Sequence, residues 1–228
     1  MSKRYRAVLL GMGVLPVSLL LAACDSDSSR VSAQEAMQLI QQSQYIPEGS
    51  AEEDLVEITP PGVWKATQSQ LFRLPGSSSL ETYVVADHQA VRIGNGFGGY
   101  GVTSVVPFDA NDDGTTDLVY AYSFGSGIHR SVISWLDLSD LTEHSVQGKE
   151  RAVDDGALGK FRTYDLILTA EGKKIVVHRI DEKHNRELTS NALRAYPNTN
   201  DLHSMALIKD SVLVRDNKEL YIEKPGGG

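Results

Sequence analysis

Oxygen-bearing side chains lie at regular intervals within residues 109–117. Ca²⁺ binds six to eight oxygens at about 2.3–2.6 Å, and alternate residues of a tight turn can direct their oxygens to one centre. Gly114 permits the sharp bend that such a loop needs. The sequence therefore predicts a calcium site, in which Thr115 contributes its main-chain carbonyl. Its members, at positions 1, 3, 5, 7 and 9, are Asp109, Asn111, Asp113, Thr115 and Asp117.

The segments on either side of this loop, residues 102–108 and 118–123, alternate in the manner of β-strands. An EF-hand would have flanking helices and a Glu at position 12, where this chain has Tyr120. The loop is thus not an EF-hand, and four clustered oxygen ligands favour a structural ion over a catalytic one. An acidic β-turn without an ion is the alternative, since Asp, Asn and Gly are common in turns.

The run Asp-x-Asn-x-Asp-Gly-x-x-Asp-Leu over residues 109–118 resembles the calcium loop of FG-GAP or VCBS-type repeats, which build integrin-like β-propellers. The resemblance implies that the ion holds a strand–loop–strand corner. Propellers of this family carry several copies of the loop, whereas this chain has one. No repeat with a period of 40–50 residues is visible.

A second candidate site follows the next predicted strand, where His129, Arg130 and Ser131 lie beside a glycine turn. Their imidazole, guanidinium and hydroxyl groups could bind an anion or a glycan, and we expect the calcium loop to hold them in a fixed shape nearby. A plain hairpin loop is the alternative. Together with Asp117, His129 and Arg130 form the constellation that a calcium-dependent hydrolase would use.

The N-terminus has the three parts of a secretory signal: basic residues, an apolar run over residues 7–21, and a small-residue cleavage site. The ending Leu21-Ala22-Ala23-Cys24 resembles the lipobox of bacterial lipoproteins. The resemblance implies that residues 1–23 are a signal peptide, and that acyl chains such as palmitate are attached to Cys24. An ordinary signal peptide with a chance cysteine is the alternative reading of the same residues.

Asp25 follows the lipidated cysteine, and an Asp at this place resembles the signal that retains Gram-negative lipoproteins at the inner membrane. The outer membrane stays open, because Ser26 stands beside it. In either case the fold faces the periplasm. The small polar residues that follow predict a flexible tether over residues 24–31.

Beyond the tether, Ser32 and Glu35 form a capping box that predicts a helix over residues 32–46. Residues 55–224 predict one mainly-β domain, an antiparallel meander of the propeller-like or sandwich/barrel kind. Among its strands we expect residues 63–65, and we expect a turn at residues 209–210 to separate two strands. The net charge of −8 argues against a nucleic-acid partner.

These features predict a lipid-anchored, calcium-stabilised binding or assembly module of the bacterial cell envelope. Its partners would be the membrane, through the lipid anchor, and an envelope protein or a glycan. An enzyme is the less favoured class, and a calcium-dependent periplasmic hydrolase is its concrete form. The only cysteine of the chain is the lipidation site, so thiol catalysis is excluded if the lipobox is used.

Overall fold

The computed structural model describes residues 30–42, 45–125, 130–148, 165–180, 207–216 and 218–223. The predicted signal peptide, Cys24 and His129 lie outside the described residues. None of the described helices is long and apolar enough to cross a membrane. The helices are α1 (Ala33–Gln42), the short 3₁₀ helix η1 (Glu52–Asp54) and α2 (Pro61–Thr67).

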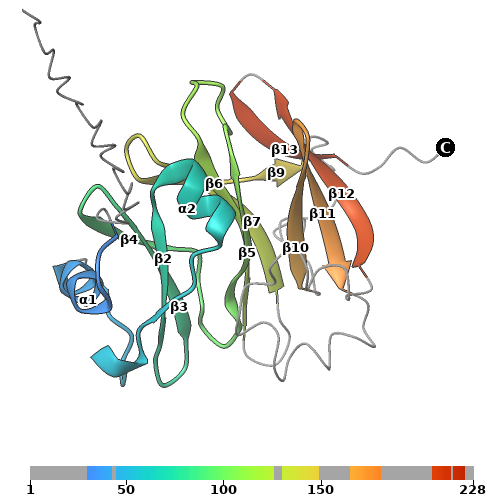
Figure 1. The fold of residues 1–228 in the computed structure, drawn as a ribbon. Coiled ribbons are helices and arrows are strands. Elements are labelled where there is room, and N and C mark those ends of the chain that lie inside the picture. The colour runs from blue at the N-terminus through green and yellow to red at the C-terminus, as the bar shows by residue number, and fades with distance from the viewer. Residues whose placement is uncertain are drawn as a thin grey trace, which may run out of the picture.

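Most described residues belong to three β-sheets, which lie side by side in Figure 1 and follow one another along the chain. The N-terminal sheet has the order β1 (Val56–Glu57), β2 (Gln70–Pro75), β3 (Leu80–Ala86), β4 (Gln89–Ile93). The middle sheet has the order β5 (Gly101–Phe108), β6 (Asp117–Phe124), β7 (Arg130–Asp137), β8 (Thr142–Ser145). The C-terminal sheet has the order β10 (Leu166–Glu171), β11 (Lys174–Ile180), β12 (Leu207–Asp216), β13 (Glu219–Glu223), β9 (Gln147–Gly148). The predicted mainly-β, antiparallel class is confirmed, with β9 as the one strand that pairs in parallel.

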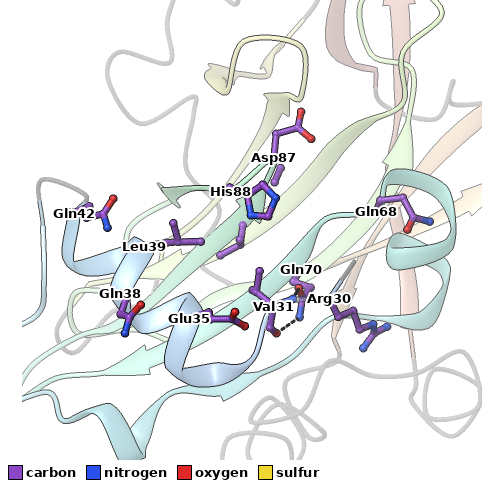
Figure 2. A pocket seen from close by; sticks show the side chains of 12 residues that line it. Arg30, Val31, Glu35, Gln38, Leu39, Gln42, Gln68, Gln70, Asp87 and His88 are labelled. Atoms are coloured by element: carbon purple, nitrogen blue, oxygen red, sulfur yellow. Dashed lines mark hydrogen bonds between the residues drawn. The ribbon is translucent and has the colours of Figure 1, made fainter. Parts of the chain in front are cut away.

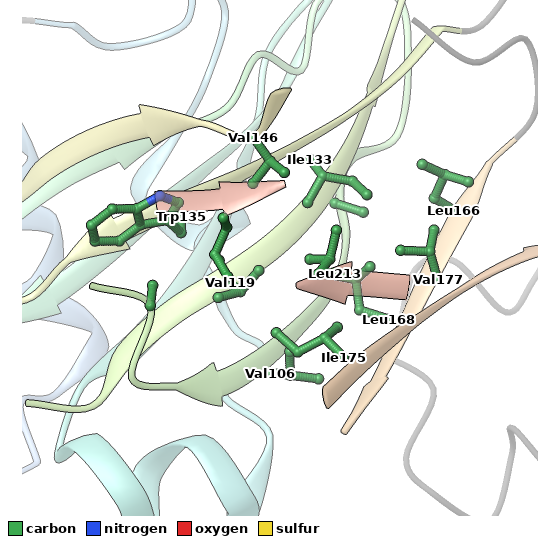
Figure 3. Packing of buried hydrophobic residues seen from close by; sticks show 13 residues of the cluster. Val106, Val119, Ile133, Trp135, Val146, Leu166, Leu168, Ile175, Val177 and Leu213 are labelled. Carbon is green, nitrogen blue, oxygen red and sulfur yellow. The ribbon is translucent and has the colours of Figure 1, made fainter. Parts of the chain in front are cut away.

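Both faces of the middle sheet are buried, one against each neighbouring sheet. Successive residues of a strand point to opposite sides, so each strand can contribute to both cores. On β6, Val119 and Ala121 join the core shared with the C-terminal sheet, whose other members include Leu168, Ile175 and Leu213 (Figure 3). Leu118 and Tyr120, one residue out of phase, join the core shared with the N-terminal sheet. One strand thus supplies two cores, and its sequence shows an almost continuous apolar run.

A third core lies between α1 and the outer face of the N-terminal sheet. Ala36 and Ile40 are fully buried there, against Phe72 and Tyr83. The predicted capping box is present: Glu35 accepts a hydrogen bond from the Ser32 amide at 2.8 Å, and the Ser32 hydroxyl accepts one from the Glu35 amide at 3.2 Å. The helix extends to Gln42 rather than through residue 46.

The expected strand over residues 63–65 is wrong, since these residues lie within α2. Pro61 occupies the first turn of this helix, where its fixed φ and missing N–H cost nothing. Gln68 ends the helix in the left-handed conformation, with φ +55°. Val63 is the buried residue of α2, so the short apolar run reflects one face of a helix.

The expected turn at residues 209–210 is also wrong, because β12 runs without interruption through these residues. Val177 pairs with Ser211 and His178 pairs with Lys209, which leaves Asp210 as an extra residue in the ladder. This extra residue is a β-bulge. The polar pair Lys209-Asp210 at the bulge has the composition of a turn, which explains the wrong prediction. The polar strand β8 was not predicted, because its four residues are all exposed.

The middle and C-terminal sheets are joined along β5 and β10 by side-chain hydroxyls. Thr103 donates to the carbonyl of Leu166 at 2.8 Å, and Ser104 accepts from the amide of Leu168 at 2.8 Å. On the other side the chain leaves β8 and forms β9, which pairs with β13. The two sheets are thus connected at both edges of the core that they share.

Replacing Ser104 with Ala should lower the free energy of unfolding by about 1–3 kcal/mol, since the buried Leu168 amide loses its acceptor. Ser131→Ala is the matched control: Ser131 is also buried in the middle sheet, but its hydroxyl has no hydrogen-bond partner among the described residues. Urea unfolding of both variants measures the difference. Equal destabilisation by the two substitutions would show that the Ser104 hydroxyl does not stabilise this contact.

Candidate metal centre

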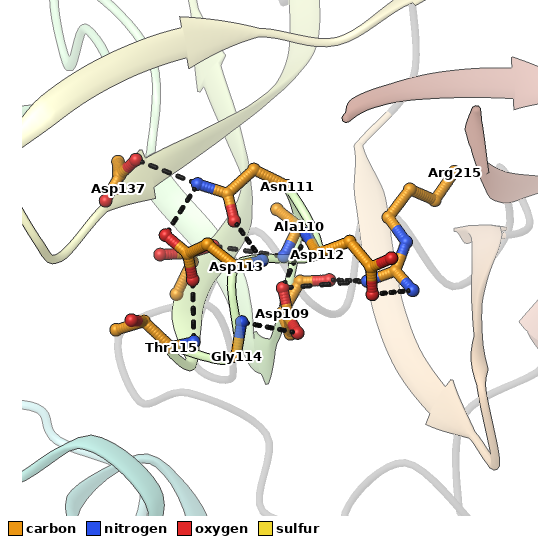
Figure 4. Close-up of polar contacts among 10 residues, drawn as sticks. Asp109, Ala110, Asn111, Asp112, Asp113, Gly114, Thr115, Asp137 and Arg215 are labelled. Carbon is orange, nitrogen blue, oxygen red and sulfur yellow. Dashed lines mark hydrogen bonds and ion pairs between the residues drawn. The ribbon is translucent and has the colours of Figure 1, made fainter. Parts of the chain in front are cut away.

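The predicted calcium loop connects β5 to β6 and is organised around its own carboxylates (Figure 4). Asp109 accepts the amides of Asp112 at 2.7 Å and Gly114 at 3.3 Å, one on each oxygen. Asp113 accepts the amide of Thr115 at 2.6 Å. Gly114 has a φ of +87°, which a residue with a side chain rarely adopts. Hydrogen bonds between these carboxylates and backbone amides therefore hold the loop in a tight turn.

Asp117 begins β6 and is completely buried. Its two oxygens accept the amides of Ala110 at 3.0 Å and Leu138 at 3.2 Å, so that it links the loop to the segment after β7. Burial raises the pKa of this carboxyl from its usual 3.8 to about 6, against the opposing effect of the two amide hydrogen bonds. The nearby carboxylates of Asp137 and Asp113 raise the pKa further.

Asp137, at the end of β7, belongs to the same cluster and was not predicted. The side-chain nitrogen of Asn111 donates to Asp113 and to Asp137, at 3.0 Å in each case (Figure 4). The signal that could have found Asp137 is the pairing of Leu118 with Leu136, which places residue 137 beside the start of β6. Strand register cannot be obtained from the loop sequence, so the loop motif alone omits this residue.

The donor chemistry of the cluster fits Ca²⁺. Its side-chain oxygens are hard ligands, and the amide group of Asn111 lies between two carboxylates, where positive charge is favoured. Asp109, Asn111, Asp113, Asp117 and Asp137 would hold the ion, with the Thr115 carbonyl as the predicted main-chain ligand. In the described part of the chain no three acidic, His or Cys side chains already form a metal cage.

Arg215 of β12 connects this loop to the C-terminal sheet. Its guanidinium donates to the carbonyl of Asp109 at 2.8 Å and pairs with Asp112 at 2.6 Å. A longer ion pair of 3.6 Å reaches the Asp109 carboxylate. The arginine therefore compensates part of the negative charge and ties two sheets together at the same point.

The second predicted site lies away from the loop, contrary to expectation. Arg130 pairs with Phe124 at one end of β6, whereas Asp117 begins the strand at its other end. Seven residue steps at about 3.4 Å each separate the two ends by about 24 Å. The loop cannot hold Arg130 and Ser131 in shape by direct contact, and Asp117 does not converge with Arg130. Arg130 is exposed and Ser131 is buried, while His129 lies outside the described residues.

A groove of about 480 Å³ opens beside the acidic cluster, between β8 and β13. Asn111 and Asp137 form part of its wall, together with Lys218. The ring of His144 is stacked on the buried Trp135, with centroids 4.3 Å apart. The groove is polar and open, which suits contact with a partner rather than enclosure of a small substrate.

Because Asp117 has a raised pKa, its contribution to stability is complete below about pH 4 and is lost as the pH rises through about 6. Without calcium, raising the pH from 4.5 to 7 should therefore lower the melting temperature of the wild type relative to that of Asp117→Asn. Calcium should reverse this shift, since a cation favours the ionised carboxylate. Thermal unfolding with and without a chelator measures both effects. A difference independent of pH would contradict the raised pKa.

Comparison of the chain with protein-family models, with curated proteins and with solved structures returned no match. The function of the chain is therefore inferred from the geometry of the described residues and from the sequence motifs. The resemblance of residues 109–118 to FG-GAP or VCBS-type loops stays a prediction.

Proposed function

We propose that this chain is a calcium-stabilised binding or assembly module of the bacterial cell envelope, anchored by lipid at Cys24 and facing the periplasm. The proposed calcium site is supported by the acidic cluster at the β5–β6 corner. There a buried carboxylate, Asp117, stands beside Asp113 and Asp137, and these acids together with Asp109 and Asp112 outnumber the neighbouring cations Arg215 and Lys218. An arrangement with this excess of negative charge is stabilised by a bound cation.

The position of the cluster supports a structural role for the ion. Asp117 reaches the residue that follows β7, and Arg215 extends from the C-terminal sheet. Ca²⁺ among these groups would hold the corner of the middle sheet and relieve the repulsion between carboxylates. We propose the same role that FG-GAP and VCBS-type loops suggest, a clamp on a strand–loop–strand corner.

The fold part of the proposal is a propeller-like arrangement of the three sheets. In the N-terminal and middle sheets the strand order follows the chain, and neighbouring sheets pack through apolar cores. A β-sandwich made of the middle and C-terminal sheets is the second possibility, favoured by the connections at both edges of their shared core. Both arrangements contain the same acidic cluster of Asp109, Asn111, Asp113, Asp117 and Asp137, which we call the calcium corner.

A binding role is preferred to hydrolysis because Asp117 and Arg130, the two described members of the suggested catalytic set, do not come together. Asp117 begins β6, and Arg130 pairs with Phe124 at the far end of that strand. The open groove beside the calcium corner offers instead a surface for an envelope protein or a glycan. The inner membrane is our first choice of location, on the strength of Asp25.

Millimolar Ca²⁺ should raise the melting temperature of the wild type, and Asp113→Ala should abolish most of this increase, because a loop carboxylate is removed. Asp54→Ala is the control: Asp54 is an exposed aspartate of η1 and lies outside the cluster. Differential scanning calorimetry with calcium or chelator measures each variant. The calcium site is refuted if the wild type shows no shift.

Cys24→Ser should release the protein from the membrane fraction, since acyl chains anchor by about 0.8 kcal/mol for each buried CH₂ and the hydroxyl cannot be lipidated. The mature wild type should carry acyl groups on its N-terminal cysteine by intact-mass spectrometry. Ser26→Ala, which leaves the lipobox unchanged, should stay in the membrane fraction. An unmodified cysteine in the wild type would exclude the lipoprotein hypothesis.

A further inference from the structure

The first residues described after the predicted lipid anchor are fixed to the fold. The Arg30 guanidinium donates to Glu57 at 3.1 Å and lies over the ring of Trp64, with its central carbon 4.5 Å from the ring centroid. The backbone of Val31 exchanges two hydrogen bonds with the side-chain amide of Gln70, at 2.7 and 3.1 Å (Figure 2). The predicted tether of residues 24–31 is therefore fixed from Arg30 onward.

This attachment limits the distance between the fold and the lipid. Six residue steps separate Cys24 from Arg30, and an extended chain spans at most about 22 Å over that length. The headgroup layer on one side of a bilayer is itself several ångströms thick. A fold anchored through Cys24 must therefore keep the surface around Arg30 close to the headgroups.

The surface around Arg30 has the composition of a membrane interface. Helix α2 contains no acidic residue, and it exposes Pro61, Lys65 and Ala66. Trp64 is half-buried beneath the Arg30 guanidinium. Tryptophan together with Lys or Arg is the combination that proteins place at the headgroup level. We call Arg30, Pro61, Trp64, Lys65 and Ala66 the α2 face.

The acidic residues of this part of the chain lie mostly elsewhere. The three acids of η1, Glu52–Asp54, are at the lower left of Figure 1, whereas α2 is in its upper half. Glu57, beside the α2 face, is paired with Arg30, so its charge is compensated. Glu35 and Asp87 line a hollow on the side of Arg30 that α1 covers. An orientation with the α2 face toward the lipid thus keeps η1 away from anionic headgroups.

We propose that the α2 face lies against the phospholipid headgroups of the membrane that holds Cys24. This inference rests on the proposed lipid anchor. It fixes how the module is oriented: Trp64 and Lys65 contact the lipid, and the groove beside the calcium corner stays available to a partner. The anchor supplies the affinity, and the α2 face selects one orientation.

The test uses the only two tryptophans of the chain, Trp64 in the α2 face and Trp135 in the core. The lipidated protein is reconstituted in phosphatidylcholine/phosphatidylglycerol vesicles containing a phospholipid with a nitroxide on its headgroup. The quencher should remove a large part of the wild-type tryptophan emission, and at least twofold less of the emission of Trp64→Phe, which reports Trp135 alone. Flotation of the vesicles establishes attachment in the same samples.

A charge reversal provides the second measurement. Lys65→Glu should reduce the quenching of Trp64, whereas Lys173→Glu, at the exposed β10–β11 turn, should leave it unchanged. Protein that floats with the vesicles but shows no quenching of Trp64 overturns the orientation and leaves the anchor in place. Protein that does not float, with an unmodified Cys24, overturns the anchor and this inference together.

Discussion

The buried carboxylate of Asp117 is the constraint on which the acidic corner depends. It accepts amides from the loop before it and from the segment after β7, so three parts of the middle sheet meet at one side chain. A carboxylate in this position costs free energy when ionised, which its raised pKa reflects. Nearby Asp113 and Asp137 increase that cost. The corner is stable only where hydrogen bonds, Arg215 or a cation compensate the charge.

The middle sheet transmits this local arrangement to the rest of the fold. Because both of its faces are buried, a change in the β5–β6 corner affects the cores on either side. Arg215 adds a direct connection to β12, and the hydroxyls of Thr103 and Ser104 connect β5 to β10. A cation at the corner would therefore stabilise the junction of two sheets as well as a loop.

The proposed anchor and the proposed calcium corner belong to different parts of the molecule. Arg30 pairs with Glu57 of the N-terminal sheet and lies over Trp64 of α2, whereas Asp109 and Arg215 join the middle and C-terminal sheets. Trp135, which lines the groove, packs into the core shared with the C-terminal sheet, whereas Val63 of α2 packs into the core on the other face of the middle sheet. This separation suits a module that is held at one side and binds at another.

Local sequence was sufficient where a short segment contains its own structural reason. The capping box of Ser32 and Glu35 began a helix as expected, and the β5–β6 loop bends sharply at Gly114, as the sequence predicted. The alternation of residues likewise predicted the two strands beside that loop, β5 and β6. Residues 63–65 were misassigned because a two-turn helix and a short strand bury the same few apolar side chains.

Tertiary structure alone decided which distant residues meet. Asp137 joins the loop through the register of β6 and β7, and Arg215 joins it through the packing of two sheets. The same register moved Arg130 to the far end of β6, although only a few residues separate it from that strand. The spacing of a motif can define a turn because the residues of a turn are close in sequence. Strand register and the packing of sheets depend instead on interactions between residues far apart in the chain.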